Sequence, residues 1–393
     1  MELANTRILF VMVLAAEYGG NLIPSWQYYS RKLKNEYHAR IAWVFPHQPA
    51  KKWLTDLQKE DDVFFIPPPQ SVDVIKELGK VILQFRPDII HSHFELYDIA
   101  VSKAVKRYAP QTRMVWHVHD IMSFDVKGVS HPVLRYIRRR ILYSLRYHVY
   151  GRDAWFVAVS DEMAHFVNYF RRHFFTTPPP FDRTKIDRTC WVRTTSLMNG
   201  LSLPRLGDIP HEKPKTASVP FRFLTFGGNF HGKGIDTVLD AGRRLEQKNR
   251  KFQIIITRGN DLEMSIMDHM NGHIPPWLKI VEQTEHVRDL FLNADCYISA
   301  SRGETMSVAV AEAEMFLLPV IQSDINGTFW NAEMPSTLLF PVEDAASLSE
   351  QMEKMMDDQC RISAMTLQTR QKVLDRFDLD LWCEKLLQIY EGL

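Results

Sequence analysis

Short apolar runs alternate with longer segments of helical periodicity along most of the chain. Strands that alternate with helices in this way are typical of parallel β-α-β units. In the first half, the runs predict strands at Ile8–Leu14, His38–Val44, Val63–Phe65, Ile89–His91, Arg113–Val118 and Trp155–Val159. In the second half, they predict strands at Phe221–Phe226, Phe252–Ile256, Leu278–Ile280, Cys296–Ala300, Val320–Gln322 and Thr337–Phe340. We therefore expect an α/β protein built from doubly wound parallel sheets.

The alternation is interrupted near the middle of the chain. Leu201–Pro220 contains four prolines and no clear hydrophobic period, which indicates a linker. We predict a first Rossmann-like domain over residues 1–205, a linker over 206–220 and a second Rossmann-like domain over 221–375. A chain of 393 residues is long enough for two such domains. We expect a cleft between them.

Composition narrows the expected partners and the compartment. Lys and Arg number 48 against 47 Asp and Glu, so the chain has no overall attraction to nucleic acid. Its four cysteines have no metal-ligand spacing, which indicates reduced thiols and a cytoplasmic setting. No apolar run reaches transmembrane length. The run Ile8–Leu14 is better interpreted as a buried first strand than as part of a signal peptide.

Two carboxylates, Glu304 and Glu312, lie eight positions apart across a predicted strand-to-helix junction. The strand Cys296–Ala300 precedes them, and a helix from Val308 to Phe316 follows, ended by Pro319. Glu304 is therefore expected in the loop at the carboxyl end of a strand, where open α/β sheets bind ligands. Glu312 is expected about two turns into the helix, where a glutamate is usually solvated. The N-terminus of that helix can bind an anion.

The spacing of the two glutamates resembles the E-x7-E motif of retaining glycosyltransferases with the GT-B fold, in particular the GT4 (group 1) family. The resemblance implies that Glu304 is catalytic, beside the transferred sugar, and that Glu312 binds the ribose of a sugar nucleotide. It also implies donor contacts from Thr305, Met306 and Ser307, where the family has G-F-G or G-F-S. The frame around the motif matches at Ser301, Pro319-Val-Ile321, Ser323-Asp324 and Gly327.

A glycine-rich turn opens the second half, with Gly227-Gly228 followed by Lys233-Gly234. Glycines let a backbone approach a diphosphate closely, and a lysine supplies a cation. Taken alone, the segment could be an ordinary turn with a solvated lysine. It resembles the GT4 stretch G-R-x-x-x-x-K-G-x-D, which implies that Gly227, Gly228 and Lys233 bind the donor and that Lys233 contacts its diphosphate. The family arginine is replaced by Gly228, and Arg258 and Arg302 are the candidates to compensate.

The first half of the chain also contains stretches that resemble the family. Gly19-Gly20 follows the first strand, where the family has a loop that faces the donor phosphates. His119 matches the family histidine near the donor sugar, which implies a catalytic role. Four histidines occur in two short stretches, at positions 91, 93, 117 and 119, but no carboxylate pattern accompanies them and we expect no metal site. Residues 376–393 resemble the family's closing helix, which returns to the first domain.

These resemblances imply a retaining glycosyltransferase that moves a hexose-type sugar from a nucleoside diphosphate sugar to a glycan or lipid-linked acceptor, in polysaccharide or glycoconjugate synthesis. No cofactor or metal is expected. The alternatives are a catalytically silent partner of an active transferase, or another GT-B enzyme such as a nucleotide-sugar epimerase or a glycan phosphorylase. The loss of the family arginine at Gly228 favours the silent partner.

Residues 132–147 have the pattern of a basic amphipathic helix. Pro132 begins it, an apolar face follows, and arginines line one edge of that face. Such a helix can lie on an anionic membrane surface, which would place the protein peripherally at the inner face of the membrane. Equally, the apolar face could pack on the first sheet. The apolar residues are Leu134, Ile137, Ile141 and Leu145, and the edge arginines are Arg135, Arg139 and Arg146.

Overall fold

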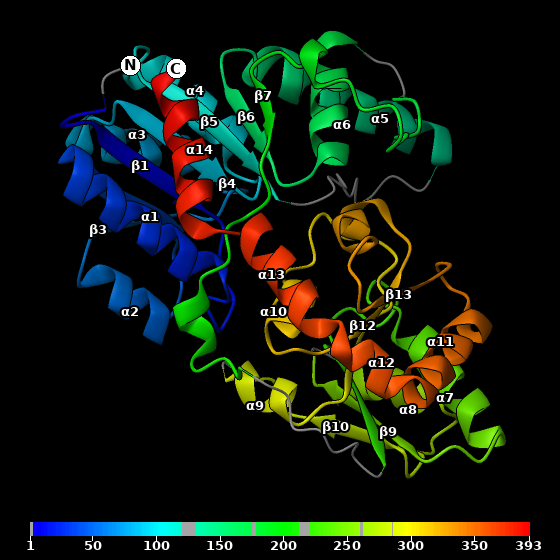
Figure 1. Cartoon of the computed structure of the whole chain (residues 1–393). Helices are drawn as coiled ribbons and strands as arrows, with labels where there is room; N and C mark the ends of the chain where they lie inside the picture. The colour runs from blue at the N-terminus through cyan, green and yellow to red at the C-terminus, as the bar shows by residue number, and fades with distance from the viewer. Residues whose placement is uncertain (1–2, 120–130, 175–177, 212–219, 260–261, 285) are drawn as a thin grey trace. The chain divides into compact units, whose positions relative to one another are not determined.

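The predicted strands form two separate parallel sheets in the computed structural model of the chain (Figure 1). The structure describes residues 3–119, 131–174, 178–211, 220–259, 262–284 and 286–393. One compact unit consists of Met1–Gly200 and Leu379–Leu393, and the other of Leu201–Asp378. The chain passes from one unit to the other after Gly200 and again after Asp378. The predicted architecture of two Rossmann-like α/β domains is confirmed.

The first unit contains a seven-stranded sheet in the order β3-β2-β1-β4-β5-β6-β7. Every described strand pair in it is parallel. The strands are β1 (Arg7–Met12), β2 (Arg40–Pro46), β3 (Asp62–Ile66), β4 (Ile89–His93), β5 (Arg113–Val118), β6 (Trp155–Ala158) and β7 (Thr194–Ser196). The helical elements are α1 (Leu22–Tyr37), α2 (Lys52–Gln58), α3 (Val74–Phe85), α4 (Asp98–Tyr108), α5 (Pro132–Ser144), η1 (Leu145–Tyr150), α6 (Asp161–Arg172), η2 (Arg188–Cys190) and α14 (Leu379–Glu391).

Apolar side chains cover both faces of this sheet. In β1, Leu9 and Val11 join a core with α3, α4 and α6, whereas Ile8 and Phe10 join a second core with α1 and α14. Neighbouring residues of a strand point to opposite faces, so a strand buried on both sides requires an unbroken apolar run. This requirement explains why the first strand reads as continuously apolar.

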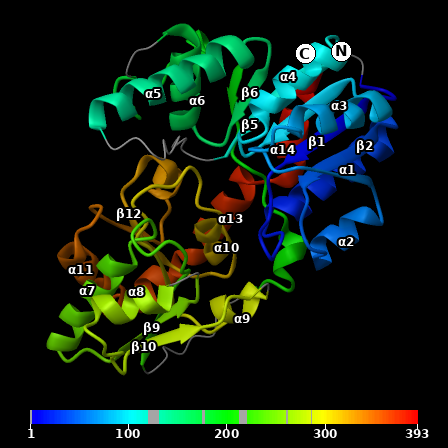
Figure 2. The same ribbon diagram turned by 180° about the vertical axis from the view of Figure 1, so that it is seen from behind.

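The last helix of the chain, α14, packs against the first one, α1, as both views show (Figures 1 and 2). Trp382 of α14 meets Trp26 of α1 edge to face, with ring centroids 4.9 Å apart. The Tyr390 hydroxyl lies 2.6 Å from Nδ1 of His91 in β4. These contacts make α14 part of the first unit's core.

The second unit contains a six-stranded parallel sheet in the order β10-β9-β8-β11-β12-β13. The strands are β8 (Phe221–Thr225), β9 (Phe252–Thr257), β10 (Leu278–Val281), β11 (Cys296–Ser299), β12 (Val320–Ser323) and β13 (Thr337–Phe340). The helical elements are η3 (Leu203–Leu206), α7 (Ile235–Gln247), α8 (Leu262–His269), α9 (Val287–Leu292), α10 (Val308–Met315), η4 (Asn326–Asn331), α11 (Ala345–Asp357), α12 (Gln359–Ala364) and α13 (Thr366–Arg376).

The strand order of each sheet reverses at one place, between β1 and β4 in the first sheet and between β8 and β11 in the second. Ligands of open α/β sheets bind beyond the carboxyl ends of the strands at such a switch point. The loops that follow these four strands are therefore where a site is expected.

Two further observations complete the fold. The short edge strand β7 was not predicted, because Thr194–Ser196 contains no apolar run. Within the part of the chain that the structure describes, no helix combines the length and the apolarity needed to cross a membrane.

Candidate active site

The switch point of the second sheet brings two predicted motifs together. Strand β8 leads into the glycine-rich turn and α7, and its neighbour β11 leads into the loop of Glu304 and α10. Strands β8 and β11 pair in parallel register, Tyr297 beside Leu224. Their carboxyl ends therefore open at the same edge, although Lys233 and Glu304 lie far apart in the sequence.

Lys233 and Glu304 form an ion pair at this edge, with Nζ 2.6 Å from Oε1. The Ser301 hydroxyl donates to the same carboxylate oxygen at 2.9 Å. The Lys233 side chain is 41% exposed and that of Glu304 only 16%, so the carboxylate is the more enclosed partner. The cation is thus held at a defined place and remains accessible from solvent.

Two glycines allow the loops to approach this closely. A Cβ atom on Gly234 would lie 2.0 Å from the Ala300 carbonyl oxygen, and Gly234 itself has φ of 63°. A Cβ atom on Gly327 would lie 1.6 Å from the carbonyl oxygen of Glu304. Side chains at these positions would push the loop backbones apart. The glycines next to Lys233 and beyond β12 therefore help to position the ion pair.

Glu312 is buried, with 3% of its surface exposed, and does not project into solvent from its helix. It acts on the same buried phenol as Glu304, that of Tyr297 in β11. Burial raises the pKa of Tyr297, and the negative charges of Glu304 and then Glu312 raise it further. Both glutamates of the motif thus lie close enough to Tyr297 to influence its pKa. Glu312 is not in the solvated position that is usual for a glutamate on a helix.

The segment between the two glutamates forms the start of α10. Thr305 is partly buried, Met306 and Ser307 are buried, and Ser307 occupies the N-cap position. No side-chain hydrogen bond caps the first turn of this helix. Its first N–H groups lie directly after the Glu304 loop, where they can face an anion.

A third glutamate, Glu314, is also buried and was not predicted. Its Oε1 atom accepts a hydrogen bond from the Thr337 hydroxyl at 3.2 Å. Burial raises the pKa of Glu314 well above its ordinary value, which favours the neutral form of its carboxyl group. The sequence signal was a second acidic residue inside an otherwise apolar helix.

The two arginines considered as replacements for the family arginine both have acidic partners. Arg302 forms an ion pair with Asp236 at 2.8 Å and another with Glu343. Arg258 lies 3.2 Å from Glu263 and 3.1 Å from Glu282. Arg302 is therefore part of an ion-pair network beside the turn. Arg258 pairs with Glu282, which follows β10. Strand β9 separates β10 from β8, which leads into the turn.

Position 228 itself is not crowded. A Cβ atom on Gly228 would meet the Lys233 side chain at an ordinary contact distance of 3.5 Å. Its neighbour Gly227 is held by a hydrogen bond from its N–H to the Thr257 hydroxyl, 2.9 Å long. The turn thus places the Lys233 side chain beside the backbone of Gly228.

In the first unit, Gly19 and Gly20 lie at the switch point, and His119 follows β5, the strand next to β4. Gly19 and Gly20 lie between β1 and α1, and Gly20 has φ of 55°, which favours glycine. His119 follows β5 and is 7% exposed. Its Nε2 atom lies 3.0 Å from Nδ1 of His93, and its ring stacks on Phe94 with centroids 4.6 Å apart. Burial lowers the pKa of His119 to about 3, so this imidazole is neutral.

His119 belongs to a stack of four buried imidazoles on β4 and β5. His91, His93 and His117 each offer a nitrogen within 4.8 Å of the others, a spacing that could suggest a metal site. The rings, however, lie nearly parallel, with interplanar angles of 14°, 15° and 22° among these three. The geometry fits a hydrogen-bonded stack, with His91 Nε2 3.2 Å from His117 Nδ1.

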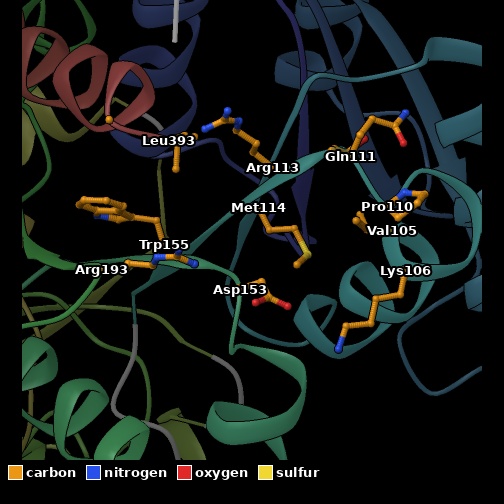
Figure 3. Close-up of a pocket in the computed structure, with 12 residues that line it drawn as sticks. Val105, Lys106, Pro110, Gln111, Arg113, Met114, Asp153, Trp155, Arg193 and Leu393 are labelled. Carbon is orange, nitrogen blue, oxygen red and sulfur yellow. The ribbon is translucent and has the colours of Figure 1, made fainter.

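A pocket of about 300 Å³ lies at the opposite edge of the first sheet (Figure 3). Arg113 and Trp155, at the amino ends of β5 and β6, line it together with Arg193, Asp153 and Lys106. It contains none of the predicted site residues. Because ligands of such sheets bind at the carboxyl ends, this pocket is not the candidate active site.

Two protein-family models of glycosyltransferases match the chain, one in each unit. A model described as glycosyl transferases group 1 matches residues 221–358, and a model described as glycosyltransferase family 4 matches residues 28–179. No curated protein matches the chain at a significant level.

Solved structures match the chain over nearly its whole length. A glycosyltransferase from Rickettsia africae ESF-5 is 16% identical, covers 99% of this chain and 98% of its own, and gives a TM-score of 0.73. HepE from Anabaena in complex with UDP is 13% identical, with 99% and 100% coverage and a TM-score of 0.73. Sucrose-phosphate synthase from Thermosynechococcus elongatus is 14% identical, with 98% coverage of both chains and a TM-score of 0.69. The GT-B fold is thereby confirmed.

The histidine stack predicts a steep loss of stability in mild acid. Burial first, and then repulsion among the rings, lowers the pKa of His91, His93 and His117 well below 6.5. The unfolded chain takes up these protons near pH 6.5, whereas the folded chain takes them up only at much lower pH. The stabilisation is therefore complete above pH 6.5 and decreases as pH falls, by up to about 1.4 kcal/mol per pH unit for each histidine.

Urea unfolding from about pH 7.5 to about pH 5.5, followed by tryptophan fluorescence, measures this slope. His93→Gln should reduce the slope, because it removes one of the side chains that take up a proton on unfolding. His47→Ala, a change at an exposed histidine, should leave it unchanged. If the unfolding free energy stays constant over this range, the histidines take up protons in the folded protein at the same pH as in the unfolded chain, and the prediction is wrong.

Proposed function

Because this chain belongs to the group 1, GT4-like glycosyltransferases, we propose that it transfers a hexose-type sugar from a nucleoside diphosphate sugar with retention of anomeric configuration. The observation that carries the proposal is the ion pair of Lys233 and Glu304, 2.6 Å long, at the switch point of the second sheet. HepE, a structural neighbour, has been solved with UDP and with UDP-glucose, which supports a nucleoside diphosphate donor.

Sugar transfer breaks the bond between the anomeric carbon and the diphosphate, and forms a bond from that carbon to an acceptor hydroxyl, which loses its proton. Negative charge develops on the departing diphosphate, and positive charge on the sugar. Lys233 and the first N–H groups of α10 are placed to stabilise the diphosphate. In this scheme the donor phosphates replace Glu304 as the partner of Lys233, which releases the carboxylate toward the sugar.

The remaining residues take supporting roles in the proposal. Glu304 stabilises the positive charge on the sugar, and Glu312 accepts hydrogen bonds from the ribose hydroxyls. Thr305, Met306 and Ser307 line the donor where α10 begins. The two glutamates do not act as the close acid and nucleophile pair of a retaining glycosidase, since Glu312 serves the nucleoside.

The first unit supplies the other donor contacts in the proposal. The loop of Gly19 and Gly20 faces the phosphates, and neutral His119 hydrogen-bonds to the sugar. The scheme requires no metal ion and no cofactor, because Lys233 and the helix N-terminus provide the positive charge. The acceptor is a glycan or a lipid-linked saccharide. A lipid-linked acceptor would bring residues 132–147 to the inner face of the membrane.

A silent partner of an active transferase is the second candidate, and the observation that favours it is Gly228. Arg258 and Arg302 both form ion pairs with acidic residues. Neither of them therefore joins Lys233 as a second cation for the donor phosphates. A thermal-shift screen against nucleoside diphosphates and their sugars tests both candidates, since a ligand of the folded state raises its apparent stability. Slow donor hydrolysis by the purified chain would support the enzyme. Binding without hydrolysis or transfer would support the silent partner, and no binding at all would exclude the enzyme.

Glu304 should govern turnover. Glu304→Gln removes the charge beside the sugar, so turnover should fall by about tenfold or more. The affinity for the free nucleoside diphosphate should stay the same or increase, because Lys233 loses its competing carboxylate. Steady-state kinetics and calorimetry measure the two effects. Glu343→Gln, which changes an exposed acid nearby, is the control, and near-parent turnover in Glu304→Gln would remove the residue from the site.

Glu312 should govern donor binding. Glu312→Gln should weaken binding of the nucleotide sugar by about 1.5–3 kcal/mol, the range of a hydrogen bond to a charged group. The matched control is Glu314→Gln, because Glu314 is equally buried in the same helix and bonds to Thr337. Calorimetric titration of both variants separates the two positions, and equal affinity would rule out the ribose contact.

Lys233 should bind the diphosphate. Lys233→Ala should weaken both the nucleoside diphosphate and the donor by about 1.5–3 kcal/mol, and Lys233→Arg should retain part of the affinity. Lys248→Ala removes an exposed lysine of the same unit and should have no effect. An unchanged dissociation constant for the free nucleotide in Lys233→Ala would contradict the assignment.

A further inference from the structure

Helix α5 exposes a row of apolar side chains. Between 37% and 58% of the surface of each is accessible, in a helix whose apolar face could have packed on the sheet. The row consists of Val133, Leu134, Tyr136, Ile137, Ile141 and Leu145, the last at the start of η1. Among the large apolar residues that are exposed in the described part of the chain, this is a concentrated group on one element. The interpretation in which this face packs on the sheet is therefore wrong.

The second half of α5 and the following turn η1 attach the helix to the first unit. Tyr143 stacks on Phe170 of α6 with ring centroids 4.7 Å apart, and the Arg140 guanidinium lies 5.9 Å from the same ring. Arg146 is 2% exposed and forms an ion pair with Asp98 of α4 at 2.5 Å. These contacts hold the helix at its C-terminal end and leave the apolar row exposed.

The exposed face is also positively charged. Arg135 and Arg138 are exposed among the apolar side chains, and Arg139 is half-buried beside them. Residues 131–150 contain no aspartate or glutamate. Arg146, expected along the charged edge, is buried, so the edge consists of Arg135, Arg138 and Arg139.

We propose that α5 docks the protein on an anionic lipid bilayer. An interfacial helix places its apolar side chains among the acyl chains and its cations at the lipid phosphates. This face offers both groups along 13 residues, a length of about 20 Å. The absence of acids along the segment favours a negatively charged lipid surface over a protein partner, which would more often meet charges of both signs.

The proposal rests on the proposed transferase function only for its purpose, which is to bring the enzyme to a lipid-linked acceptor. Docking itself requires neither donor nor acceptor. The two can therefore be tested separately.

Co-sedimentation of the full chain tests the docking. Vesicles of phosphatidylcholine with phosphatidylglycerol should bind the protein at low salt, and high salt should weaken the binding because it screens the arginines. Pure phosphatidylcholine vesicles should bind it poorly. Arg135→Glu with Arg138→Glu should lower partitioning by about tenfold or more. Leu134→Ser with Ile137→Ser should lower it as well, because the apolar contribution is lost.

A matched control carries Leu367→Ser and Arg361→Glu, an exposed apolar residue and an exposed arginine of the second unit, and should bind as the parent does. Thermal melts and the donor-induced thermal shift should be unchanged in the α5 variants, so a loss of vesicle binding is not a loss of folding or of donor binding. Conversely, a parent chain that binds vesicles but no nucleotide sugar would defeat the proposed function and leave the docking intact.

Three results would overturn the docking proposal. The first is no vesicle binding at low salt. The second is undiminished binding by the arginine variant. The third is a concentration-dependent dimer, seen by size-exclusion chromatography, that the serine variant abolishes while the parent fails to bind vesicles. This last result would make the face a contact between copies of the chain.

Discussion

The ion pair between Lys233 and Glu304 depends on a reversal of strand order. Only at the switch point of a doubly wound sheet do the loops after two neighbouring strands diverge to opposite faces and leave space between them. Strands β8 and β11 occupy that place, and Gly234 and Gly327 let the loop backbones approach within contact distance. A lysine and a glutamate far apart in sequence thus become partners 2.6 Å apart, and one anionic ligand can exchange that partnership.

The first unit is organised around a different constraint, the burial of neutral imidazoles. His91, His93 and His117 point to the face of the sheet that α1 and α14 cover, where Trp26 lies edge to face with all three rings. Tyr390 of α14 provides the hydrogen bond to His91. Attachment of the last helix and the charge state of the stack are thereby linked, because protonated rings this close would repel one another in a medium of low polarity.

The fold could be predicted from sequence because its signal is local and repeated. Each buried strand is an apolar run, and each run is followed by a helical period. The short strand β7 lacks such a run and was missed. Glu304 and Lys233 were placed on loops by the strand-to-helix junctions around them, and both lie there. The burial of Glu312 and Glu314 could not be predicted, because it depends on partners outside the helix, such as Tyr297 and Thr337.

Helix α5 shows why a periodic pattern alone does not decide which face is buried. Its apolar residues would have packed on the sheet if apolar burial alone set its rotation. Instead, Arg146 reaches Asp98 and Glu95, and an arginine buried away from these acids would cost several kcal/mol. The π-helical turn η1, which adds residues per turn, brings Arg146 inward where a regular period predicted an exposed edge. The row thus keeps five aliphatic side chains exposed, although each would contribute about 1.5–3 kcal/mol if it were fully buried. A row of that size, left facing water, requires a surface to cover it.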